Sequence, residues 1–232
     1  MPTPDRFDDR AHAGKLLAQR LSAYANRPDV LVLALPRGGV PVGFAVAHAL
    51  GVELDVMLVR KLGMPGQEEY AMGAVGAGGV RVVQAGLVES GLVTLDQIEE
   101  ASTRELGEIA RRDRLYRAGR PAPDLAGRCV ILVDDGIATG ATLRAAVEVV
   151  RQSRVARLVI AAPVGAPDSV DALAPEVDEM VCLATPFQFR AVSQWYRHFD
   201  QTSDAEVQDL LALAWREHAA RTAIAPPTQP DH

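Results

Sequence analysis

The sequence predicts an α/β fold in which a mainly parallel, twisted sheet is flanked by helices. Two observations support this prediction. Short apolar runs with the length of a buried strand alternate with longer segments in which apolar residues recur at helical spacing. Such an alternation favours parallel strands joined by crossover helices. One apolar run also ends in two adjacent carboxylates and a small-residue loop, as at the ligand-binding edge of an open parallel sheet.

The N-terminal part of the chain predicts a helix followed by a strand–helix–strand unit. Pro41 in the first turn and Gly51 just past the last turn mark the limits of the second helix. The expected elements are a helix at Asp8–Ala25 in an N-terminal unit of residues 1–29, a strand at Val30–Leu35, a helix at Val40–Leu50 and a strand at Leu54–Val59.

A glycine-rich segment follows, and then the alternation resumes. Residues 61–79 predict a flexible loop that leads into short strands near Ala71–Val75 and Val80–Val83. Thr94 and Gln97 are expected to form a capping box. The later elements are helices at Thr94–Arg117, Thr139–Gln152, Asp168–Ala174 and Ser203–Arg221, and strands at Val130–Val133, Val155–Ala161 and Met180–Ala184. We thus expect a core of residues 30–184, a C-terminal unit of residues 185–224 and a disordered tail of residues 225–232.

Composition argues against several classes of protein. The chain has 232 residues, of which 48% are hydrophobic, enough for an ordinary core. The net charge of −6 argues against non-specific nucleic-acid binding, which requires a basic surface. Cys129 and Cys182 lie singly in apolar runs, which indicates buried thiols in a reducing compartment. Neither a signal peptide nor a membrane-spanning run is evident, so we expect a soluble cytoplasmic protein.

The segment VILVDDGIATGAT, residues 130–142, carries the strongest chemical signal. Its strand delivers Asp134 and Asp135 to the sheet edge, and a small-residue loop then opens into a helix. Backbone N–H groups and the positive helix terminus would meet there and bind an anion, with hydroxyl donors from Thr139 and Thr142. Paired carboxylates beside an anion site are explained if they accept hydrogen bonds from a sugar diol. A magnesium ion that bridges the ligand would further offset the charge, usually through retained waters.

This segment closely resembles the signature of type I phosphoribosyltransferases, which binds 5-phosphoribosyl 1-pyrophosphate (PRPP). The resemblance extends over about Val30–Ala184 and implies the fold of that family, a flexible lid at residues 61–79 and a C-terminal hood. It implies that Asp134 and Asp135 hold the ribose hydroxyls, and magnesium through water. It also implies a homodimer. The PRPP-binding residues by this resemblance are Asp134, Asp135, Gly136, Ala138, Thr139, Gly140, Ala141, Thr142, Gly38, Gly39 and Arg60.

Two positions qualify the resemblance. Gly136 stands where the family usually has an aliphatic residue, which suggests a more flexible loop. Ala138 stands where hypoxanthine-type members have an aspartate that contacts the purine ring, so a hypoxanthine or guanine acceptor is disfavoured.

Further candidates surround this segment. Arg37, Gly38 and Gly39 resemble the pyrophosphate loop of the family, although Pro-Arg-Gly-Gly alone predicts only a turn. Arg60 and Lys61 follow the next strand, where the family carries cations that reach pyrophosphate; the alternative is a solvated strand end. The candidate catalytic residues are Arg37, Lys61 and, in the lid, Glu69. An ordinary polar loop would also explain Glu69.

The aromatic residues after the last strand are candidates for acceptor binding. Phe187, Phe189 and Trp195 would form a hood suited to a flat nitrogenous base, or they could simply pack on the sheet. Arginines of the predicted helix at Thr94–Arg117 alternate with glutamates, which predicts a self-compensated, solvated or subunit-contacting helix.

The sequence therefore predicts a phosphoribosyltransferase that joins PRPP to a small nitrogen acceptor and releases pyrophosphate. The expected partners are PRPP, magnesium and the acceptor, with no nucleic acid and no membrane. Two alternatives stay open: a PRPP-sensing regulator without catalysis, and another sugar-phosphate enzyme on the same scaffold.

Overall fold

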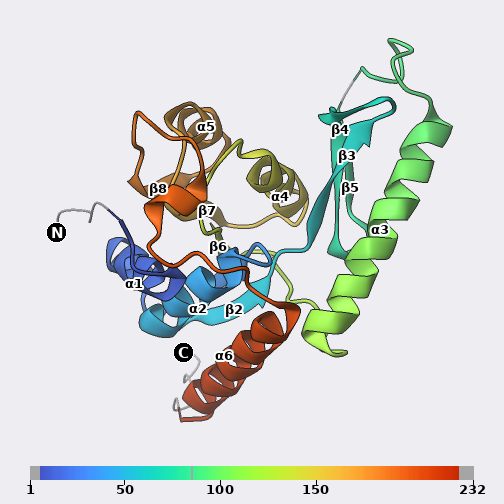
Figure 1. Cartoon of the computed structure of the whole chain (residues 1–232). Coiled ribbons are helices and arrows are strands. Elements are labelled where there is room, and N and C mark those ends of the chain that lie inside the picture. The colour runs from blue at the N-terminus through green and yellow to red at the C-terminus, as the bar shows by residue number, and fades with distance from the viewer. Residues whose placement is uncertain (1–5, 85, 225–232) are drawn as a thin grey trace.

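A five-stranded parallel sheet forms the centre of the computed structural model, which describes residues 6–84 and 86–224 (Figure 1). The strand order is β2-β1-β6-β7-β8. Its strands are β1 (Val30–Ala34), β2 (Glu53–Val56), β6 (Cys129–Val133), β7 (Arg157–Val164) and β8 (Glu179–Ala184). The predicted α/β class with a mainly parallel sheet is confirmed.

Helices cover both faces of this sheet because alternate strand residues point to opposite sides. Val32 faces a core that includes residues of α1, α2 and α6, whereas Leu33 faces a core that includes residues of α4 and α5. Strands β1 and β6 are buried on both faces, as expected for a parallel sheet. The helices are α1 (Arg10–Arg20), α2 (Gly39–Leu50), α4 (Ala141–Arg151), α5 (Pro167–Leu173) and α6 (Asp204–Ile224), and short 3₁₀ helices occur at Ser22–Tyr24, Ala77–Gly79, Ala174–Glu176 and Val192–Trp195.

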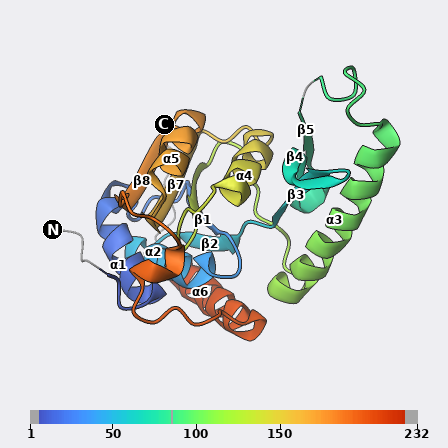
Figure 2. The same ribbon diagram turned by 45° about the horizontal axis from the view of Figure 1, so that its top comes forward.

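A second, antiparallel sheet stands beside the main sheet and carries a long helix (Figures 1 and 2). We call this part the arm. It consists of β3 (Val59–Met64), β4 (Gln67–Gly76), β5 (Arg81–Val83) and α3 (Leu95–Arg117). The capping box predicted for α3 is confirmed, since Thr94 Oγ1 accepts from Gln97 N at 3.2 Å and Gln97 Oε1 accepts from Thr94 N at 2.9 Å.

The arm differs from the sequence prediction in two respects. The single strand expected at Leu54–Val59 is divided between β2 and β3, which belong to different sheets. The apolar run continues through Leu58 because that side chain is buried at the junction as well. Residues 61–79 form most of a β-hairpin rather than an irregular loop, and Gly66 makes its turn possible with a φ of 73°.

A buried ion pair anchors the C-terminal end of α3 to the main sheet. Arg117 Nε lies 2.9 Å from Asp55 Oδ1, and Arg117 Nη2 donates to the Val56 carbonyl oxygen at 2.9 Å. Both side chains are at most 3% exposed. Arg117 is thus an internal anchor, whereas the charge pattern predicted a self-compensated helix that is solvated or contacts a subunit.

Among the described residues, no helix is both long enough and apolar enough to cross a membrane. The tail expected at residues 225–232 lies outside the described residues.

Candidate functional site

Two adjacent carboxylates lie at the carboxyl end of β6, where the sequence predicted them. Asp134 Oδ1 accepts a hydrogen bond from the Asp135 backbone N at 2.8 Å. Burial raises the pKa of Asp134 well above its usual range, and the neighbouring Asp135 charge raises it further. Burial also raises the pKa of Asp135, against the opposing effect of Arg10. The pair therefore stores unfavourable electrostatic energy that a cation or hydroxyl donors would relieve.

Asp135 is held from two sides by contacts that sequence reasoning did not identify. Arg10 Nε lies 2.8 Å from Asp135 Oδ2, and the Tyr196 hydroxyl donates to the Asp135 carbonyl oxygen at 2.6 Å. Arg10 also donates to the Asp200 carbonyl oxygen at 2.7 Å, and its guanidinium lies 3.9 Å from the Phe199 ring centroid. These contacts join α1 to the segment after β8. No local pattern could have revealed them, because the partners are far apart in sequence.

The loop after the carboxylates leads directly into α4, as predicted. Ile137 is buried, and its backbone N donates to the Val164 carbonyl oxygen at 2.8 Å, so the loop is fixed to the end of β7. Gly140 caps α4 with a left-handed φ of 72°, a conformation that glycine adopts without strain. Ala138 and Thr139 are exposed. The first N–H groups of α4 therefore face a position that an anion can reach.

The segment after β8 packs against this loop at Gly136. A Cβ on Gly136 would lie 2.5 Å from Val192 Cγ1, so an aliphatic residue cannot be accommodated there while Val192 keeps its position. This contact gives a physical reason for the glycine at a position where the resembling family has an aliphatic residue. Phe189 and Trp195 pack in a cluster with Phe7 and Tyr196, whereas Phe187 is 97% exposed and lies outside that cluster.

The loop after β1 lies directly against the two carboxylates. A Cβ on Gly38 would lie 2.0 Å from Asp135 Oδ2, and one on Gly39 would lie 2.7 Å from the Val133 carbonyl oxygen. Both glycines are therefore required by close approach, although neither has a positive φ. The peptide between Pro36 and Arg37 is cis. Arg37 Nη1 lies 3.7 Å from Asp204 Oδ1 at the start of α6, and Arg37, Gly38 and Asp135 border one cavity of about 360 Å³.

A larger cavity, which we call the arm cavity, lies between the arm and the start of α4. Its volume is about 500 Å³. The lining residues are Pro36, Val59, Arg60, Lys61, Gly63, Arg104, Glu105, Arg112, Ala141 and Thr142. Arg60 and Lys61 are thus brought together with the predicted phosphate loop. Their expected neighbour Glu69 has its backbone in β4, and its side chain lies outside the described residues.

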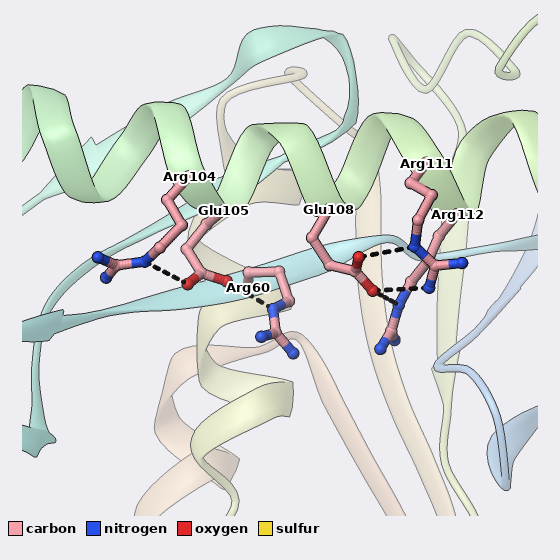
Figure 3. A network of polar contacts seen from close by, with 6 residues as sticks. All are labelled: Arg60, Arg104, Glu105, Glu108, Arg111 and Arg112. Carbon is pink, nitrogen blue, oxygen red and sulfur yellow. Dashed lines mark hydrogen bonds and ion pairs between the residues drawn. The ribbon is translucent and has the colours of Figure 1, made fainter.

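Three lining residues of the arm cavity come from α3 and were not predicted as site residues: Arg104, Glu105 and Arg112. Figure 3 shows them in a polar network with Arg60, Glu108 and Arg111. The alternation of arginine and glutamate suggested only mutual compensation, because helical periodicity does not reveal what faces the helix.

Comparison with known proteins gives a consistent set of relatives. The sequence model of the family described as phosphoribosyl transferase domain matches residues 7–192. Two curated proteins of Mycobacterium tuberculosis, from strains CDC 1551 and H37Rv, each bear the name "Putative phosphoribosyl transferase". Each is 48% identical over 218 residues, covering 94% of this chain and 49% of the relative. The chain thus spans about half the length of these curated relatives.

A solved structure also matches most of this chain. The crystal structure of the protein TT1426 from Thermus thermophilus is 43% identical to this chain, with a TM-score of 0.82. The match covers 89% of this chain and 97% of that one. This chain therefore shares its fold with a protein of known structure over nearly the whole length of that protein.

Proposed function

The chain belongs to the phosphoribosyl transferase domain family, and from this premise we propose that it transfers the phosphoribosyl group of PRPP to a nitrogen acceptor. One observation carries the proposal. The loop after β1 and the loop after β6 touch, because Gly38 and Gly39 lie against the carboxylates of Asp135 and Asp134. Two candidate anion loops and a candidate diol-binding pair consequently face the same edge of the sheet.

Each group has a distinct part in the proposed reaction. Asp134 and Asp135 accept hydrogen bonds from the ribose hydroxyls, and the loop Ala138–Thr142 holds the 5′-phosphate with backbone N–H groups. Arg37, with the backbone of Gly38 and Gly39, binds the pyrophosphate. Arg60 and Lys61 at the arm cavity add positive charge to the same end of the substrate.

The two carboxylates after β6 suit the chemistry of a magnesium ion. Desolvation raises the pKa of Asp134 and the Asp135 charge raises it further, although Arg10, which forms an ion pair with Asp135, opposes this rise. Two carboxylates would hold magnesium mainly through water and substrate oxygens, which is the usual arrangement for this ion. When bound, the ion would neutralise charge on the leaving pyrophosphate.

The proposed transfer breaks the bond between the anomeric carbon and the pyrophosphate oxygen, and forms a bond from that carbon to the acceptor nitrogen with inversion. The departing pyrophosphate takes the bonding electrons, and the acceptor nitrogen loses its proton to a base. Glu69 in the β3–β4 hairpin is our candidate base. The chain contributes by positioning and by electrostatic stabilisation, and closure of the hairpin would exclude water from the reacting carbon.

The acceptor that we propose is a flat nitrogenous base held under the hood by Phe189 and Trp195. Both side chains already pack in the cluster that adjoins Tyr196, so the hood offers aromatic surface next to the Asp135 segment. Ala138 provides no carboxylate for a purine ring, which argues against hypoxanthine and guanine.

The test is magnesium-dependent release of pyrophosphate from PRPP across a panel of purines, pyrimidines and small amines. We expect release with one class of acceptor, and a loss of about a hundredfold or more in an Asp134→Asn/Asp135→Asn double variant. PRPP binding without turnover across the panel would instead support a regulator. Occupation of the phosphate loop by other sugar phosphates, with no binding of PRPP, would overturn the proposal.

A further inference from the structure

The arm cavity is lined by more cationic side chains than the proposed function assigns a role to. Four cationic side chains line it, and Glu105 is the single carboxylate among the lining residues. Two of the cations, Arg104 and Arg112, come from α3. The opposite wall includes Ala141 and Thr142 of the first turn of α4, and Pro36 of the loop after β1. The cations of α3 therefore face both loops that we assign to phosphate groups.

Arg60 and Arg112 each form an ion pair that leaves N–H donors of the guanidinium group available. Arg112 Nε lies 2.7 Å from Glu108 Oε1, and Arg60 Nε lies 2.8 Å from Glu105 Oε2. Within the part of the chain that the structure describes, the terminal nitrogens of both residues donate no hydrogen bond. Figure 3 shows the guanidinium ends of Arg60 and Arg112 projecting to the same side of α3. Two guanidinium groups with free terminal N–H groups thus lie on the same side of α3. Paired N–H groups of this kind match the spacing of phosphate oxygens.

We infer that Arg104 and Arg112 of α3, together with Arg60, bind the pyrophosphate group of PRPP, so that α3 forms one wall of the substrate site. This inference rests on the proposed function, because it assigns further residues to the same substrate. A charge-rich group at this position needs several cations, and guanidinium forks recognise phosphate more specifically than ammonium groups do. The arm therefore contributes residues that bind the pyrophosphate group, and its role is not limited to movement of the β3–β4 hairpin.

The glutamates of α3 act as exchangeable partners in this arrangement. Glu105 contacts both Arg60 and, at 3.4 Å, Arg104. The Arg60 and Arg104 side chains are 42% and 64% exposed, and such exposed pairs are weak. A pyrophosphate group can consequently replace the carboxylate as their partner at small cost. Removal of the charge of Glu105 should therefore strengthen pyrophosphate binding, whereas removal of the charge of Arg112 should weaken it.

The experiment is calorimetric binding of inorganic pyrophosphate to the full chain and its variants. We expect Arg112→Gln to weaken binding about tenfold, as for loss of one charge-assisted hydrogen bond, and Glu105→Gln to strengthen it a few-fold. Arg111→Gln is the matched control, because Arg111 also contacts Glu108 at 2.8 Å but does not line the cavity. Its affinity should stay within about twofold of wild type.

Two further measurements keep the outcomes separate. Ribose 5-phosphate has no pyrophosphate, so its affinity should be the same in wild type and Arg112→Gln. Arg112→Lys retains the charge and should recover part of the lost affinity, and thermal denaturation checks that each variant folds.

Equal effects of Arg111→Gln and Arg112→Gln, or no pyrophosphate binding by wild type, would overturn the inference. If wild type binds PRPP and the α3 variants bind it equally, only this inference fails. If pyrophosphate binds through Arg112 but PRPP does not bind, the proposed function fails, and Arg112 belongs to a site for pyrophosphate as a separate ligand.

Discussion

Arg10 links α1 to the carboxylate pair, and its replacement tests whether that link supports the site. The guanidinium contacts Asp135 at 2.8 Å, and the side chains of the pair are only 12% and 15% exposed. The same group donates to the Asp200 carbonyl oxygen at 2.7 Å. In Arg10→Gln, Asp135 would lose its cation while it stays beside Asp134. The variant therefore removes an attraction and leaves a repulsion in place.

The magnitude follows from this burial. Loss of one partner from a fully buried ion pair costs about 3–5 kcal/mol. Water still reaches part of the Arg10–Asp135 pair, so we expect Arg10→Gln to lower the free energy of unfolding by about 2–3 kcal/mol. For a chain of this size, that change corresponds to a decrease of roughly 5–10 °C in the melting temperature. Arg197→Gln is the control, since Arg197 lies 3.5 Å from Asp8 and is 66% exposed. Its effect should stay below about 1 kcal/mol.

The assay is urea denaturation of wild type, Arg10→Gln, Asp135→Asn and the double variant. A coupling free energy of about 1 kcal/mol or more between the two substitutions would show that the pair itself is stabilising. Arg10 also opposes the rise in the pKa of Asp135, so its loss should make PRPP binding more sensitive to acid. Strictly additive effects, together with an unchanged pH profile of binding, would refute the reasoning.

Three further predictions concern packing, anchoring and titration. Gly136→Val should destabilise the protein by about 1–3 kcal/mol in urea denaturation, because the new Cβ meets Val192, and Val192→Ala should recover part of the loss. Arg117→Leu should cost about 3–5 kcal/mol, because it leaves Asp55 buried without its cation; an unchanged denaturation midpoint would contradict the assignment of this pair as the anchor of α3. Burial raises the pKa of Asp134 above its value of about 3.9 in the unfolded chain, so wild-type stability should fall as pH rises from that value through the folded pKa. Asp134→Asn, without ligand, should consequently melt higher than wild type at neutral pH and equally at about pH 4 or below, and a constant difference at all pH values would exclude this titration as the cause.

Local sequence signals predicted the main sheet well and the arm poorly. Buried strands such as β6 were evident because their apolar runs end abruptly at polar residues or turns. At Met57 and Leu58 the chain leaves one sheet for another without any break in burial, so the apolar run did not show where β2 ends. The hairpin of β3 and β4 was obscured by its glycines. Gly73 is required there because a Cβ would lie 2.1 Å from the Val82 carbonyl oxygen of the neighbouring strand.

The same distinction applies to the candidate site. The segment from Asp134 to Thr142 was recognisable because its residues act together over one strand, one loop and one helix start. Arg10 and Tyr196 could not be assigned from sequence, because their contacts with Asp135 depend on how distant segments pack. Arg112 was misjudged for a related reason. Its spacing from Glu108 indicated a helical ion pair, which exists, but spacing alone could not show the cavity on its other side.

The start of α6 connects the arm to the loop that we assign to pyrophosphate. Asp204 Oδ1 accepts a hydrogen bond from the Tyr116 hydroxyl of α3 at 2.6 Å, and the same oxygen lies 3.7 Å from Arg37 Nη1. Burial and this carboxylate raise the pKa of Tyr116 to about 12, so the hydroxyl keeps its proton and remains a donor at neutral pH. Because Arg117 fixes the next residue of α3 to the main sheet, the end of the helix cannot shift without disturbing these contacts. The position of Arg37 therefore depends on the placement of α3, and the wall that carries Arg112 is coupled to the loop on the opposite side of the cavity.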